Sequence, residues 1–140
     1  GDLKGQTLTY IGDGNNVANS LMICGALLGV NIRIASPKGF EPLPAIVDHA
    51  RSIALEGSNI EVLNDPLEAV KGAQALYTDV WASMGQEEEQ IKRKEIFEKY
   101  TVDQNLINLA ANEVILLHCL PAHRGEEITE EALESKKRGK

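Results

Sequence analysis

The chain lacks the long apolar run that a membrane-spanning helix needs. Its apolar segments, such as residues 114–117, are far shorter than the stretch of about 18 residues that crosses a bilayer. Its first residues also lack the basic and then apolar pattern of a secretory leader. We therefore expect a soluble protein that makes no membrane contact.

Cysteine is scarce, and basic residues are fewer than acidic ones. The two cysteines, Cys24 and Cys119, lie far apart and do not form the closely spaced set of a secreted disulfide scaffold. This usage favours a reducing compartment, and we expect a cytoplasmic protein. With 21 acidic against 14 basic residues, the formal charge is −7, a field that repels phosphate backbones. Nucleic acid is therefore not an expected partner.

The remaining composition is that of an ordinary globular domain. Hydrophobic residues make up 43% of the 140 residues and charged residues 25%, and a chain of this length can bury a core without disulfides or metals. We expect one domain over residues 1–140. Because the sequence closes on the basic run at residues 136–140, we interpret it as a fragment of a longer protein.

Five β-prone segments alternate with helical patterns along the chain. Strands in such an order are joined by right-handed crossovers, which place helices on both faces of a parallel sheet. The sequence therefore predicts an α/β fold, a doubly wound, Rossmann-like parallel sheet of about five strands with helices on both faces. The predicted strands are Thr7–Ile11, Asn31–Ala35, Ile60–Leu63, Ala75–Thr78 and residues 114–117.

The helix after the first strand carries an apolar stripe at helical spacing, which predicts a face turned toward the core. Cys24 belongs to this stripe, and we interpret it as a core residue without a catalytic role. The stripe consists of Val17, Leu21, Cys24 and Leu28.

Further helices are predicted from their ends and their apolar positions, including one over residues 103–111. One begins at Pro44 and ends near Gly57. A short one follows Asp65, which is expected to cap it just before Pro66. A charged helix is predicted over residues 87–100. Its few apolar anchors are Ile91, Ile96 and Phe97.

Ligands of doubly wound sheets bind at the carboxyl ends of strands, near the point where the strand order reverses. This rule selects the loops at residues 12–16, 79–84 and 118–124. The Gly12-x-Gly14 pattern in the first loop is typical of a pyrophosphate site. A third glycine is missing, however, because Val17 takes its position, and the second strand ends without the acid that binds a ribose. No nucleotide or other cofactor is expected.

Five side chains in these loops are candidates for binding or catalysis. Asp79 ends the fourth strand, where its carboxylate can hold an ammonium group or form a turn. Ser83 and Met84 follow in the same loop. Cys119 is either a reactive thiol or a small buried side chain. His118 cannot easily serve it as a base, because successive residues of an extended segment point to opposite sides. The three histidines show no metal-ligand spacing, so no metal site is expected.

Several strings of the sequence resemble the ornithine carbamoyltransferase family, in the same order and spacing. They are GDGNN at residues 12–16, SPKGFEP at 36–42, NDPLEA at 64–69, TDVWASMGQE at 78–87 and HCLP at 118–121. The resemblance extends over nearly the whole chain, and no single motif carries it alone.

The resemblance implies that this chain is the second, ornithine-binding domain of a two-domain enzyme. That enzyme converts carbamoyl phosphate and L-ornithine, its small-molecule substrates, into L-citrulline and phosphate. The family's phosphate-binding Ser-x-Arg-Thr-Arg signature, which belongs to the carbamoyl-phosphate-binding domain, is absent here, so the chain alone is expected to be inactive. The family's homotrimer is built largely through that other domain, and we expect this piece to be a monomer.

The resemblance also implies how ornithine is held. Asn16 and the main chain of Met84 would bind the ornithine carboxylate. Asp79 and Ser83 would bind the α-amino group. The amides near the start of a helix and the carboxylate at a strand end fit these charges.

On the carbamoyl side, the resemblance assigns three consecutive residues. Cys119 matches the family's reactive cysteine beside the side-chain amine of ornithine. Leu120 would offer its main chain to the carbamoyl group, and His118 would assist that group. Cys119 and Asp79 are the catalytic candidates, and which of them accepts a proton stays open.

Two other interpretations remain beside this one. A carbamoyltransferase for another amine, such as putrescine or an N-modified ornithine, would share the fold and most of the loops. A free-standing amino-acid-binding module would also share the fold, since fold alone does not fix function. Such a module has no need of a thiol at Cys119.

Overall fold

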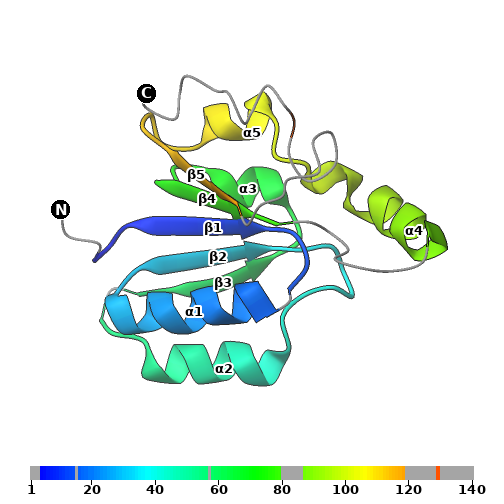
Figure 1. Cartoon of the computed structure of the whole chain (residues 1–140). Coiled ribbons are helices and arrows are strands. Elements are labelled where there is room, and N and C mark those ends of the chain that lie inside the picture. The colour runs from blue at the N-terminus through cyan, green and yellow to red at the C-terminus, as the bar shows by residue number, and fades with distance from the viewer. Residues whose placement is uncertain (1–3, 15, 57, 80–86, 119–128, 130–140) are drawn as a thin grey trace.

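The computed structural model describes residues 4–14, 16–56, 58–79, 87–118 and 129. These residues form one five-stranded sheet in which every pairing is parallel, with the strand order β3-β2-β1-β4-β5 (Figure 1). This order confirms the predicted doubly wound α/β fold. The strands are β1 (Thr7–Ile11), β2 (Asn31–Ala35), β3 (Ile60–Leu63), β4 (Ala75–Thr78) and β5 (Ile115–His118).

Helices cover both faces of the sheet. On one face lie α1 (Asn16–Leu28) and α2 (Pro44–Ile53), and on the other lie α3 (Pro66–Val70) and α5 (Gln104–Leu109). The remaining helix, α4 (Glu87–Phe97), continues into the 3₁₀ turn η1 (Glu98–Tyr100) and extends beyond the end of the sheet toward which the strands point (Figure 1). In the described part of the chain, no helix is long and apolar enough to cross a membrane.

The sheet separates two apolar cores, because successive strand residues point to opposite faces. Tyr10 of β1 is buried in the core beneath α1 and α2, whereas the next residue, Ile11, is buried in the core beneath α3 and α5. Both side chains are fully buried.

The predicted core face of α1 is confirmed only in part. Val17 and Leu21 are half-buried and pack against the core, but the other two residues of the stripe do not. Cys24 is a free, exposed cysteine, and Leu28 is 53% exposed. The fully buried side chains of α1 are Ala18, Met22 and Ala26. Small residues are needed because α1 approaches β2 closely: a Cβ at Gly25 would lie 2.3 Å from Cγ1 of Ile32. Helix α1 has apolar residues on two sides. The spacing of its larger apolar residues predicted the side that is only partly buried in the structure.

The structure corrects several element ends. The second helix stops at Ile53 and not near Gly57, because the N–H of Ala54 turns back to the oxygen of Arg51. The last strand begins one residue later than predicted, at Ile115. The helix predicted over residues 87–100 is α-helical only as far as Phe97.

Of the three anchors predicted for that charged helix, only Phe97 is buried. Ile91 and Ile96 are 58% and 44% exposed in the described structure. Their periodic positions in the sequence therefore do not correspond to packing against this sheet. By contrast, the predicted cap of α3 is confirmed, since Asp65 Oδ1 accepts a hydrogen bond from the N–H of Leu67 at 3.0 Å.

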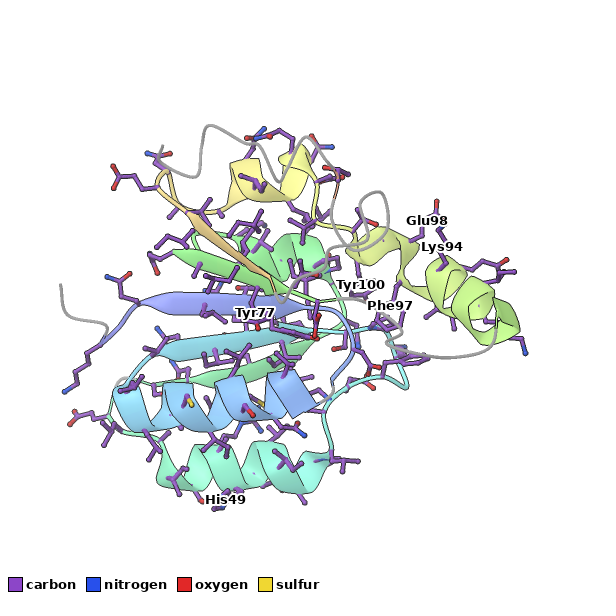
Figure 2. All side chains as sticks on the ribbon, in the orientation of Figure 1. His49, Tyr77, Lys94, Phe97, Glu98 and Tyr100 are labelled. Carbon is purple, nitrogen blue, oxygen red and sulfur yellow. The ribbon has the colours of Figure 1, made fainter. Side chains whose placement is uncertain are left out.

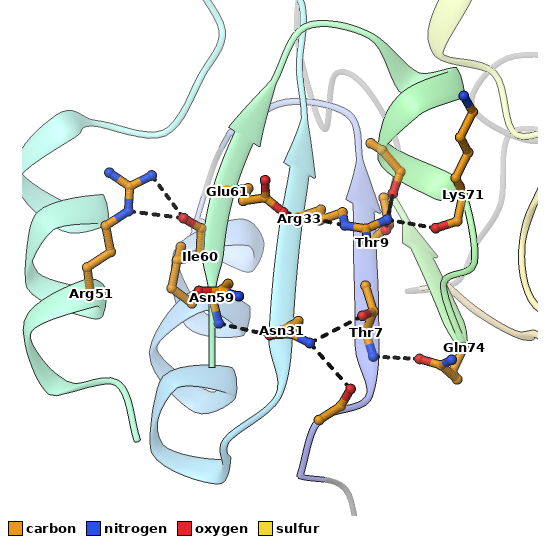
Figure 3. Close-up of polar contacts among 12 residues, drawn as sticks. Thr7, Thr9, Asn31, Arg33, Arg51, Asn59, Ile60, Glu61, Lys71 and Gln74 are labelled. Carbon is orange, nitrogen blue, oxygen red and sulfur yellow. Dashed lines mark hydrogen bonds and ion pairs between the residues drawn. The ribbon is translucent and has the colours of Figure 1, made fainter. Parts of the chain in front are cut away.

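Polar side chains hold neighbouring strands and helices in register (Figure 3). The guanidinium of Arg33 on β2 donates to the main-chain oxygens of Ala69 and Lys71, at 3.1 and 2.8 Å, which ties the sheet to α3. On the other face, Arg51 of α2 donates twice to the oxygen of Ile60 on β3, at 3.0 and 2.9 Å. Each arginine thus fixes a helix against one face of the sheet.

Candidate functional site

Three strands end at the same level of the sheet. The register pairs Ile11 at the end of β1 with Thr78 at the end of β4, and Thr78 with His118 at the end of β5. The strand order reverses between β1 and β4, because β2 and β3 lie on one side of β1 and β4 and β5 on the other. Gly12 and Asp79 therefore leave the sheet side by side at the point where ligands of such folds bind.

Asp79 comes directly after β4 and is half-buried. The preceding Thr78 is fully buried, and its hydroxyl donates to the main-chain oxygen of Ile11 at 3.0 Å. This bond satisfies a buried hydroxyl and joins the two strands beside the reversal point. The direction in which the chain leaves β4, and with it the position of Asp79, is fixed by the sheet.

The loop between β1 and α1 is held by the segment that follows β2. Ser36 is fully buried and donates from its hydroxyl to the oxygen of Gly12 at 2.5 Å. The N–H of Gly14 donates to the oxygen of Phe40 at 2.7 Å. A Cβ at Gly14 would lie 2.2 Å from the main-chain nitrogen of Pro42. The Gly-x-Gly pattern thus serves backbone contact at this position, and the loop leads into α1, which begins at Asn16.

A polar network supports this segment from the side of β3. The amide of Asn64 donates to the oxygen of Ser36 at 2.8 Å and to Oε2 of Glu41 at 3.0 Å. The hydrogen bond from Asn64 is the main cause that lowers the pKa of the Glu41 carboxyl, which also accepts a bond from the N–H of Gly39. The charged carboxylate of Glu41 thus helps to hold the segment that contacts Gly14.

The phenol of Tyr100, in η1, adds a further hydrogen bond to this network. It donates to the main-chain oxygen of Asn64, and its burial raises the pKa of this phenol, with a further rise from the carboxylates of Asp65 and Glu41. The phenol therefore remains a hydrogen-bond donor through the neutral pH range.

An aromatic cluster attaches the base of α4 to the same segment. The rings of Phe40 and Phe97 meet edge to face with centroids 5.1 Å apart, and Phe97 contacts Tyr100 in the same way at 6.1 Å. Figure 2 shows Phe97 and Tyr100 between α4 and the ends of the strands, and Tyr77 over the sheet. The chain has two phenylalanines, and both are used here.

An open pocket of about 610 Å³ lies between η1 and the loops after β2 and β3. Its lining includes Lys38, Asn64, Glu95 and Lys99, so it carries charges of both signs. The residues around it do not include Asp79, which leaves the sheet between β1 and β5. The pocket is therefore separate from the candidate site at the strand-order reversal.

The structure describes only part of the predicted site. Asp79 stands at the reversal point as expected, Asn16 is the first residue of α1, and His118 is the last residue of β5. The sequence analysis missed Ser36 and Thr78, although both are polar residues at strand ends. The predicted residues that lie outside the described part of the chain are Ser83, Met84, Cys119 and Leu120.

The described residues offer no cluster for a metal. Nowhere among them do three histidine, cysteine, aspartate or glutamate side chains come together in a way that could hold an ion. His49 lies on the outer side of α2, away from the sheet (Figure 2).

The fold is that of a doubly wound α/β domain, with an acidic residue and a helix start at the reversal point, where such domains bind their ligands. The family model described as "Aspartate/ornithine carbamoyltransferase, Asp/Orn binding domain" matches residues 4–139. The chain therefore belongs to the aspartate/ornithine carbamoyltransferase family, as the Asp/Orn binding domain.

Relatives in this family are similar over almost the whole chain. An ornithine carbamoyltransferase of Parasynechococcus marenigrum is 65% identical over 135 residues, and one of Prochlorococcus marinus is 67% identical over 135 residues. Each alignment covers 96% of this chain but only 42% of the relative. The chain thus spans less than half the length of the curated relatives it matches.

Solved structures agree with the fold. The ornithine carbamoyltransferase from Pyrococcus furiosus superimposes with a TM-score of 0.90 at 47% sequence identity, covering 96% of this chain and 44% of that one. The enzyme from Gloeobacter violaceus gives a TM-score of 0.86 at 48% identity, covering 96% of this chain and 45% of that one.

Proposed function

We propose that the protein to which this chain belongs transfers the carbamoyl group of carbamoyl phosphate to the side-chain amine of L-ornithine, giving L-citrulline and phosphate. The chain itself would be the ornithine-binding domain, and a second domain would bind carbamoyl phosphate. The observation that carries the proposal is the position of Asp79 directly after β4, beside β1 at the strand-order reversal. The relatives that share 65% and 67% of its residues are named ornithine carbamoyltransferases.

The charges at this edge fit an amino acid. The Asp79 carboxylate, with the hydroxyl of Ser83, would bind the positive α-amino group. Asn16, at the first turn of α1, and the main chain of Met84 would bind the negative α-carboxylate, which also gains from the positive end of the helix dipole. An amino acid held in this way would extend its side chain toward the loop after β5.

The reaction requires the side-chain amine to lose a proton. An alkyl amine has a pKa of about 10.4, so only about one molecule in 10³ is neutral at pH 7, and generating the neutral form costs roughly 4–5 kcal/mol. Only the neutral amine attacks the carbamoyl carbon. A bond between nitrogen and carbon forms, the bond between carbon and the phosphate oxygen breaks, and phosphate leaves with its electron pair.

The residues after β5 would act on this step. Cys119 would lie beside the amine, where a thiolate can accept its proton. His118 and the main chain of Leu120 would stabilise the oxygen of the carbamoyl group as negative charge develops on it. Asp79 is the second candidate for the proton acceptor.

The same proposal covers the assembly and the compartment. The complete enzyme would be a homotrimer in the cytoplasm, with most of the trimer contacts in the carbamoyl-phosphate-binding domain. The 140-residue piece would be a monomer without activity of its own. Light scattering of the piece gives the test: a mass near 15.3 kDa is expected, and a tight trimer would contradict the assignment of the trimer contacts to the other domain.

The function is tested with the product of the complete reading frame. Phosphate release from carbamoyl phosphate is measured with L-ornithine as the acceptor, and in parallel with L-aspartate or putrescine. With ornithine, citrulline is measured as well. We expect turnover with ornithine at an efficiency at least about 100-fold above either alternative, because putrescine lacks the α-carboxylate and aspartate has no side-chain amine to receive the carbamoyl group. Preference for another amine, or the absence of turnover, would contradict the proposal.

A further inference from the structure

Hydrogen bonds connect four segments of the chain beside the loop between β1 and α1. The phenol of Tyr100 in η1 donates to the main-chain oxygen of Asn64, which follows β3. The side-chain amide of Asn64 donates to the main-chain oxygen of Ser36, which follows β2, at 2.8 Å. The hydroxyl of Ser36 donates to the main-chain oxygen of Gly12, which follows β1, at 2.5 Å. We call these three bonds the Tyr100–Gly12 series.

All three bonds of the series have the same form. In each of them a side chain donates to the main-chain oxygen of the next residue, and so fixes the backbone from which the next side chain extends. A polar network in which every member is bonded restricts the segments that it joins to one arrangement, whereas apolar contacts allow several. The series thus ties the backbone at Gly12 to the position of η1, although the two are far apart in the sequence.

Both ends of the series are shielded from water. Ser36 is fully buried and Tyr100 is 5% exposed, so water cannot readily replace either hydroxyl as a donor. The ring of Tyr100 packs against Phe97 at the base of α4 (Figure 2). Phe97 in turn contacts Phe40, whose main-chain oxygen accepts a hydrogen bond from the N–H of Gly14 at 2.7 Å. The aromatic cluster therefore holds the start of the series in place and contacts the same loop.

The series ends at a residue that has no side chain with which to hold its own position. Gly12 follows the last residue of β1 at the strand-order reversal. Its main-chain position depends on the partners of its own N–H and oxygen, which are Ala35 and Ser36. The loop then leads to Asn16, where α1 begins. A binding group works only when it is held to within about 0.5 Å of its productive position, so a displaced Gly12 would affect whatever Asn16 binds.

We propose that Tyr100 is a positioning residue for ornithine recognition. Through the Tyr100–Gly12 series, its hydroxyl holds the loop that leads to Asn16 in the place where Asn16 can bind the ornithine carboxylate. The inference rests on the proposed function and deepens it, because it adds a residue that acts on the substrate only through others. The carbamoyl-phosphate site, which would belong to the other domain, does not depend on the series.

The variant Tyr100→Phe removes the hydroxyl alone and keeps the ring beside Phe97. In the complete protein, loss of this hydrogen bond from the series should raise the KM for L-ornithine by at least about 5-fold. The KM for carbamoyl phosphate should change by less than about 2-fold. An unchanged KM for ornithine, or an equal rise of both KM values, would overturn the positioning role.

Thr9→Val is the matched control. Thr9 is fully buried on β1, and its hydroxyl donates to the main-chain oxygen of Ala69 at 2.7 Å, outside the series. The variant removes a buried hydroxyl from the same sheet and should lower the thermal midpoint, as Tyr100→Phe does. It should leave the KM for ornithine unchanged. If both variants raised that KM equally, general destabilisation would be the cause and the positioning role would be overturned.

Ser36→Ala tests whether the bonds act as a series. This variant already disconnects Tyr100 from Gly12, so adding Tyr100→Phe to it should raise the KM for ornithine by less than about 2-fold more. If the effects of the two variants multiplied, the two hydroxyls would act independently, and the series would be overturned.

Hydrogen exchange gives a readout that needs no turnover. The N–H groups of Gly12 and Gly14 donate to the oxygens of Ala35 and Phe40. In the complete protein they should exchange at least about 3-fold faster in Tyr100→Phe than in Thr9→Val, and equal exchange would overturn the series. A wild type without ornithine turnover would contradict the proposed function, and this inference with it. Normal wild-type turnover with an unchanged KM in Tyr100→Phe would overturn this inference alone.

Discussion

The hydroxyl of Thr78 donates to the main-chain oxygen of Ile11 over 3.0 Å, across the two strands between which the strand order reverses. Both residues are fully buried. Asp79 follows Thr78 directly. The hydrogen bond of Thr78 therefore also fixes the position of the main chain at Asp79. Stability and the geometry of the candidate site depend here on the same pair.

Replacing Thr78 by valine should therefore destabilise the protein. The variant keeps the shape of the side chain but removes the donor to a buried oxygen, which costs about 1–3 kcal/mol. Urea unfolding measures the loss, with Thr78→Ser as the control, since serine keeps the hydroxyl. Coincident unfolding curves for the valine variant and the wild type would show that the bond contributes nothing.

Gly14→Ala should impair both the fold and ornithine binding. The new Cβ would fall 2.2 Å from the nitrogen of Pro42 and 2.5 Å from the carbonyl carbon of Glu41, and both are main-chain atoms that cannot turn aside. The loop before Asn16 would have to move, so the KM for ornithine should rise in the complete enzyme.

Gly72→Ala is the matched control for that variant. Gly72 has a φ of +69° and open space around its Cβ position, so its substitution costs backbone strain of about 1–2 kcal/mol without a clash. It should lower stability and leave the KM unchanged. A KM that rises equally in both variants would mean that general destabilisation is the cause.

Glu41 should make stability depend on pH in the acid range. Its pKa is lowered in the folded protein, chiefly by the hydrogen bond from Asn64. The contribution is therefore complete above the ordinary pKa of 4.5 and disappears as the pH falls through the lower, folded value. Between pH 7 and pH 3, the unfolding free energy of the wild type should fall more steeply than that of Glu41→Gln. If the unfolding free energies of the two proteins fell in parallel with pH, Glu41 would not be a cause of the pH dependence.

Turn residues and burial made the strands predictable from the sequence. The first strand is stopped at Ile11 by Gly12, which has a φ of +145°, and its bounds agree with the prediction. The face of α1 was not predictable in the same way, because two sides of the helix are apolar. The periodicity of the larger apolar residues predicted that Leu28 is buried. In the structure, Ala18 and Ala26 face the sheet instead, because their small side chains allow the helix to approach it closely.

The candidate site was predictable to the extent that it depends on strand ends. Asp79 could be located because a fold rule ties function to the carboxyl edge of the sheet. The network of Ser36, Asn64 and Tyr100 could not, because its hydrogen bonds join residues 28 and 36 positions apart. No local pattern in the sequence reports such contacts.

The central claim, that the reversal-point carboxylate holds ornithine, is tested most directly by one substitution. In the complete enzyme, the efficiency of citrulline formation is compared for the wild type, Asp79→Ala and Asp48→Ala, which removes an exposed carboxylate on α2. The account predicts a loss of at least about 100-fold for Asp79→Ala in a protein that is still folded by circular dichroism, and no loss for Asp48→Ala. Near-wild-type ornithine kinetics in Asp79→Ala would contradict it.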